Sequence, residues 1–69
     1  MKNNPAKIPK RIVIHTRDVE NITGLRPRTA QKLLQNIRQR FGKPEEAFIT
    51  IGEFSIYTGI KEDQLREFL

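Results

Sequence analysis

Apolar side chains recur with helical spacing in the middle of this 69-residue chain. Between positions 27 and 41 they are Ala30, Leu33, Leu34, Ile37 and Phe41. At about 100° per residue, all five lie within an arc of roughly 100°, which is typical of the buried face of an amphipathic helix. Pro27 suits the first position of a helix, and Gly42 followed by Pro44 suits its end. The pattern therefore predicts a helix at about 27–41.

Shorter patterns flank this helix on both sides. The β-branched run at 11–15 predicts a strand, and Thr16 is a suitable N-cap for a helix over 17–23. Gly24 ends that helix, because glycine adopts a left-handed backbone without a Cβ clash. In the C-terminal part, the same signals predict a strand over 48–51, a helix over 52–58, a turn at Gly59 and Ile60, and a last helix over 61–69.

The C-terminal elements repeat the N-terminal ones at a distance of 35 residues. That shift aligns Gly59 with Gly24 and Phe54 with Val19. We interpret the pattern as an internal duplication of a strand–helix–turn–helix unit. Two such units could pair their strands and share one apolar core, which would help so short a chain to fold.

Charge is distributed unequally between the two units. Thirteen Lys and Arg against eight Asp and Glu give a net charge of +5. Residues 10–43 contain nine Lys or Arg against Asp18 and Glu20, whereas residues 44–69 contain six Asp or Glu against Lys61 and Arg66. A polyanion such as a nucleic acid would therefore approach the first unit.

These observations define the predicted organisation. The fold class is mainly α: a small helical domain of two helix-turn-helix-like units, with one short two-stranded β pairing. A single domain spans 11–69, with a basic DNA-binding unit at 11–43 and an acidic second unit at 44–69 for packing or self-association. Residues 1–10 show no periodicity, and we expect a flexible basic arm there.

Composition argues against several classes of function. The chain has no Cys, and its single His15 cannot supply the ligands of a zinc site, so we expect no disulfide and no metal. It has no glycine-rich phosphate loop and no paired nucleophile and base, so we expect no enzyme, no cofactor and no small-molecule substrate. No run approaches the roughly 18 apolar residues of a membrane span. We expect a cytoplasmic, nucleoid-associated protein without a membrane partner.

Residues 15–35, HTRDVENITGLRPRTAQKLLQ, resemble the helix-turn-helix of bacterial DNA-binding proteins of the excisionase-like or small transcriptional regulator type. The matching positions are the turn glycine and the apolar residues around it, namely Val19, Gly24, Leu25, Ala30 and Leu33. The resemblance implies that the second helix enters the major groove with its N-terminal residues against base edges. It also implies a transcriptional regulator or an accessory factor of a mobile element.

The polar face of the 27–41 helix supports the same expectation independently. Four of its side chains lie within about 60° of one another: Arg28, Lys32, Gln35 and Gln39. The stripe contains no acid, although glutamate favours helices and a merely solvated face usually includes it. Arg and Gln can bind guanine and adenine edges, and Lys and Arg can bind phosphates. A solvated face of a basic protein is the alternative interpretation.

The predicted partner is duplex DNA. We expect base contacts from Arg26, Arg28, Gln31, Lys32 and Gln35. We expect phosphate contacts from Thr16, Arg17, Arg38, Lys10 and Arg11. A further set of C-terminal residues could form a homodimer interface or complete the monomer core: Phe48, Phe54, Tyr57, Phe68 and Leu69. The alternative functions are a protein-interaction module that docks through its acidic, aromatic C-terminal half, and RNA binding by the basic helix.

Overall fold

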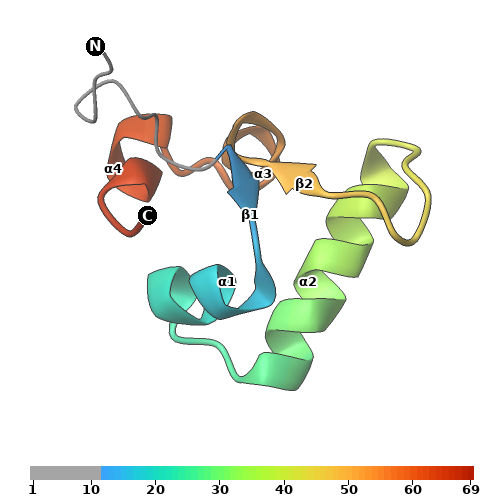
Figure 1. Cartoon of the computed structure of the whole chain (residues 1–69), viewed down its shortest axis with the longest axis horizontal. Coiled ribbons are helices and arrows are strands. Elements are labelled where there is room, and N and C mark those ends of the chain that lie inside the picture. The colour runs from blue at the N-terminus through green and yellow to red at the C-terminus, as the bar shows by residue number, and fades with distance from the viewer. Residues whose placement is uncertain (1–11) are drawn as a thin grey trace, which may run out of the picture.

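The computed structural model describes residues 12–69, which form four helices and two short strands (Figure 1). In chain order these are β1 (Val13–Ile14), α1 (Thr16–Thr23), α2 (Pro27–Arg40), β2 (Ile49–Thr50), α3 (Ile51–Thr58) and α4 (Glu62–Arg66). The predicted fold class, mainly α with one short strand pair, is confirmed. The arm predicted at 1–10, with Lys10, and the neighbouring Arg11 lie outside the described residues.

The two strands come from the two units and pair antiparallel. Val13 lies opposite Thr50, and Ile14 lies opposite Ile49. Ile14 and Ile49 are 35 residues apart, so each unit contributes the equivalent position to the pair. The expected pairing between the two β-branched runs is therefore confirmed, and it joins the units side by side.

The same hydrogen bonds close the turns of both units. The N–H groups of Gly24 and Gly59 each donate to the carbonyl four residues earlier, at 2.8 Å. Both glycines have a left-handed backbone, with φ of 78° and 81°. The hydroxyls of Thr23 and Thr58 each donate to the carbonyl four residues earlier and accept from the N–H two residues later. The 35-residue repeat is thus present in the turn geometry as well as in the sequence.

Two helices begin one residue earlier than predicted. Thr16 is the first residue of α1 and not its N-cap, which is His15 with an extended backbone. The Asp18 carboxylate stabilises this start by accepting a hydrogen bond from the His15 N–H at 2.8 Å. At α3, Thr50 and Glu53 form a reciprocal capping box, in which each side chain accepts from the other residue's N–H. Both starts are therefore fixed by an acid three residues after the cap.

The last helix is shorter than predicted. α4 ends at Arg66, although the pattern predicted a helix over 61–69. The N–H groups of residues 67, 68 and 69 donate to carbonyls three residues earlier, which is the spacing of tight turns and not of an α-helix. The units therefore differ most in their second helices, with fourteen residues in α2 and five in α4.

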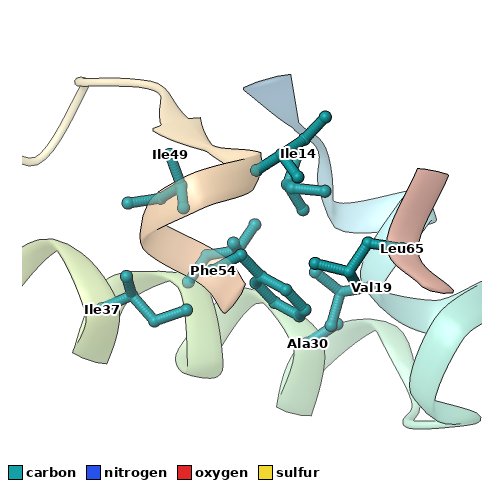
Figure 2. Packing of buried hydrophobic residues seen from close by; sticks show 9 residues of the cluster. Ile14, Val19, Ala30, Ile37, Ile49, Phe54 and Leu65 are labelled. Atoms are coloured by element: carbon teal, nitrogen blue, oxygen red, sulfur yellow. The ribbon is translucent and has the colours of Figure 1, made fainter. Parts of the chain in front are cut away.

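Buried apolar side chains from both units form one core (Figure 2), made of Ile14, Val19, Ala30, Leu34, Ile37, Ile49, Ile51, Phe54 and Leu65. Phe54 of α3 is the largest fully buried side chain. Figure 2 shows its ring directed toward α2, with Ile37 on one side and Val19 on the other. Because α3 fills the space behind α2, only the outer face of α2 is open to solvent.

Lys43 attaches the loop between α2 and β2 to the second unit. Its Nζ donates to the Phe48 carbonyl at 2.6 Å and to the Glu53 carboxylate at 2.7 Å. The same carboxylate oxygen accepts the N–H of Thr50, so the ion pair and the capping box share one acceptor. The two charged side chains are 22% and 24% exposed, which shields the pair partly from water.

This ion pair predicts a loss of stability in acid. The hydrogen bond from Lys43, and then that from the Thr50 N–H, hold the pKa of Glu53 below its usual value of 4.5. A lowered pKa in the fold stabilises it above that usual value, and the contribution is lost as the pH falls through the folded pKa. We expect Glu53→Gln to be less stable than the wild type at neutral pH and to lose less stability on acidification. Urea unfolding at neutral pH and at about pH 3 would measure this, and equal losses for both proteins would contradict it.

The turn glycine of the first unit predicts a second effect on stability. Gly24→Ala is expected to cost about 1–2 kcal/mol. Nothing lies within 4 Å of a Cβ added there, so the cost arises from the left-handed backbone alone. Gly24→Asn is the matched variant, because asparagine adopts this conformation with less strain. Thermal unfolding followed by circular dichroism would compare them, and equal losses would refute the strain explanation.

Candidate nucleic-acid interface

The positions that resemble a helix-turn-helix form the contact between α1 and α2. Val19 and Ala30 are fully buried where the two helices meet. Leu33 is partly buried and packs against the same core, whereas Leu25 in the turn is 36% exposed. α2 therefore rests on α1 and the core through one face, and its opposite face is directed away from both.

The outer face of α2 carries cations and amides but no carboxylates. Four of the predicted base-contact residues are exposed: Arg26, Arg28, Gln31 and Lys32. Gln39 is exposed on the same stripe, and Gln35 is half-buried. No ion pair within residues 12–69 engages Arg28 or Lys32. Their charges are therefore available to an approaching anion.

Arg38, predicted to contact phosphate, is partly engaged within the protein. Its Nε donates to the Ala47 carbonyl at 2.7 Å, and its Nη1 donates to Gln35 Oε1 at 2.9 Å. A guanidinium has five N–H donors, so three remain for another partner. Sequence reasoning placed both residues on the binding face but missed their contact. The spacing of three residues on a helix was the signal that could have indicated it.

The N-terminus of α1 contributes a smaller part of the candidate surface. Arg17 is exposed there, and Thr16 beside it is half-buried. Asp18 is only 5% exposed, and its carboxylate accepts the His15 N–H, so its negative charge is withdrawn from the surface. The first turn of α1 therefore adds a cation to the surface without an exposed acid.

The acidic residues of α4 lie in the other unit. Figure 1 shows α4 at the opposite end of the long axis from the C-terminal end of α2. The 35-residue shift places Asp63 on Arg28 and Glu67 on Lys32, so the second unit has the opposite charge at both positions. Arg66 pairs with Glu62 at 3.3 Å, which leaves α4 acidic on balance. Only one of the two units can therefore attract a polyanion through its second helix.

The structure divides the C-terminal aromatic residues between core and surface. Phe54 belongs to the core, and Leu69 is partly buried against it. The remaining three are exposed to solvent: Phe48, Tyr57 and Phe68. Phe54 and Leu69 therefore contribute to the monomer core, and a homodimer interface stays a prediction for the three exposed residues alone.

A pocket at the C-terminal end of α2 was not predicted. It has a volume of about 500 Å³ and is lined by Arg40, Phe41, Ile56 and Tyr57. Ile56 is 74% exposed, the highest value among the exposed large apolar residues of the described chain. The available signal was the sequence of α3, which is apolar on more faces than one core can cover.

Comparison with protein-family models, with curated proteins and with solved structures gave no match to this chain. Within residues 12–69, no helix is long and apolar enough to cross a membrane. The same residues contain no group of three or more acidic or histidine side chains arranged to hold a metal ion.

Proposed function

We propose that this protein binds duplex DNA by inserting α2 into the major groove, as a small transcriptional regulator or a mobile-element accessory factor. The outer face of α2 carries the proposal. Five Lys or Arg lie on this helix or at its N-cap, and no Asp or Glu does. An α-helix of about 10–12 Å diameter matches a major groove about 12 Å wide.

The proposal assigns different tasks to the two ends of the surface. The N-cap and the first nine residues of α2 contact base edges through Arg26, Arg28, Gln31, Lys32 and Gln35. Arg17 and Thr16, at the start of α1, contact the phosphate backbone. The unused N–H groups of Arg38 reach a phosphate on the other side of α2. Exposed cations with no carboxylate between them support this assignment.

A salt titration of binding to duplex DNA tests the proposal. Each phosphate contact releases about one counterion, so log affinity should fall with log salt concentration by several units. A structured RNA of the same length, added as competitor at equal salt, separates DNA binding from RNA binding. A flat, salt-insensitive response, or stronger competition by the RNA than by unlabelled duplex, would refute the proposal.

The pocket at the end of α2 supports a second copy of the chain as a further partner. Exposed apolar patches commonly mark interaction sites, and three exposed apolar or aromatic side chains line this pocket: Phe41, Ile56 and Tyr57. One α2 helix covers few base pairs, so a dimer would double the contacts along the DNA. Mass photometry with and without duplex DNA, for the wild type and Ile56→Asp, would test this. A monomer under all conditions would refute the dimer, and a stable complex with another protein but no DNA would favour the interaction module.

A further inference from the structure

Gln35 differs from the other amides on the outer face of α2. It is half-buried, and its Oε1 accepts a hydrogen bond from Arg38 Nη1 at 2.9 Å. Gln31 and Gln39 are exposed, and no hydrogen bond within residues 12–69 engages either amide. Among the described residues, Gln35 is therefore the one side-chain amide on this face whose oxygen accepts a hydrogen bond from the protein. This bond distinguishes its oxygen from its nitrogen.

The guanidinium that holds Gln35 is itself fixed. Arg38 Nε donates to the Ala47 carbonyl at 2.7 Å, in the loop that follows α2. Two N–H groups of one planar fork are thus bound on two different sides, which restricts rotation of the guanidinium. Because Oε1 is directed to this group, the Nε2 amino group of Gln35 is the end with no partner among the described residues.

The exposed end decides which base the amide can recognise. Glutamine binds adenine through two hydrogen bonds, in which Oε1 accepts from N6 and Nε2 donates to N7. Arg38 occupies one of the two lone pairs of Oε1, so the amide presents two free donors and an acceptor that faces a cation. Guanine presents two acceptors in the major groove, O6 and N7, so it fits a donor better than adenine does. The nearby positive charge of Arg38 also favours the guanine O6 over the adenine amino group.

We infer that Arg38 is a positioning residue that holds Gln35 with its donors outward, so that position 35 selects guanine over adenine. This inference rests on the proposed DNA binding by α2. It assigns Arg38 a role in specificity beyond the phosphate contact, and it explains why a cation on the flank of the helix is tied to the following loop.

Selection of bound duplexes from a randomised library tests the inference. The base position contacted by residue 35 is the one whose preference disappears in Gln35→Ala. At that position the wild type should favour guanine over adenine by about tenfold. Arg38→Met keeps the aliphatic stem but removes every donor, so the freed amide should change the preference to adenine. The loss of one charge lowers affinity for all sequences alike, which does not alter a ratio between bases.

Two further variants provide controls. Gln35→Glu keeps an acceptor for Arg38 and preserves the fold, but it has no donor, so the preference for guanine should disappear. Gln31→Ala marks a position that Arg38→Met should leave unchanged. Two results would overturn the inference while leaving DNA binding intact. One is a preference for adenine in the wild type. The other is that Arg38→Met and Gln35→Glu both keep the preference of the wild type. A library without any retained duplex would instead refute the proposed function, and the inference with it.

Discussion

Replacing Phe54 by alanine is expected to unfold a large fraction of the molecules at 25 °C. The ring is fully buried at the centre of the shared core, where it meets residues of both units. Removing a buried phenyl ring costs about 3–5 kcal/mol, because apolar contacts are lost and a cavity remains. The core of a domain of this size rarely supplies more than about 3–5 kcal/mol of stability, and this chain has no cysteine to add a disulfide. The cost and the total are therefore of the same size.

Ile56→Ala is the matched control for this prediction. Ile56 lies on the same helix, two residues after Phe54, but it is 74% exposed. Its replacement should change stability by no more than about 0.5 kcal/mol. Urea and thermal unfolding followed by circular dichroism would compare the two variants. A loss below about 1 kcal/mol for Phe54→Ala would mean that the core can relax around the missing ring, contrary to the packing in Figure 2.

The elements that the sequence predicted well are those set by local chemistry. α2 follows from the period of its apolar residues and from the proline and glycine at its two ends. The turns at Gly24 and Gly59 follow from the left-handed backbone that glycine adopts without strain. Pairing of the strands was less certain from the sequence, because two residues on each side carry little signal. The 35-residue repeat supplied that information, since equivalent positions of two units can meet at a common centre.

The features that the sequence did not predict depend on tertiary contacts. Phe48 and Phe54 are the same residue type six positions apart, yet one is 63% exposed and the other is fully buried. Phe48 precedes β2, where two strand residues give no period, and Phe54 lies in an eight-residue helix that is apolar on several faces, so the pattern cannot distinguish them. The contact of Arg38 with Ala47 likewise depends on the path of the loop after α2. Helical spacing predicted that Arg38 lies on the flank of the candidate face, but it could not predict where the guanidinium lies.

Replacing Arg28 and Lys32 together by alanine is expected to remove much of the affinity for DNA. Both cations are exposed, lie one turn apart and have no ion-pair partner within residues 12–69. If each contacts a phosphate or a base beside one, the slope of log affinity against log salt should decrease by about two units. Alanine favours helices, so α2 itself should be retained. Fluorescence anisotropy on labelled duplex at several salt concentrations would measure the slope.

Lys61→Ala with Arg66→Ala is the control that separates a local contact from net charge. It lowers the charge of the chain by the same two units, but in the acidic second unit. Lys61 lies 35 residues after Arg26, at the equivalent N-cap position of α4. If DNA lies along α2, this control should retain nearly the full slope, because its cations belong to α4 and its N-cap, outside the candidate surface, and salt screens separated charges. Equal losses in both double variants would mean that DNA responds only to the total charge of the protein, and α2 would then not be its binding surface.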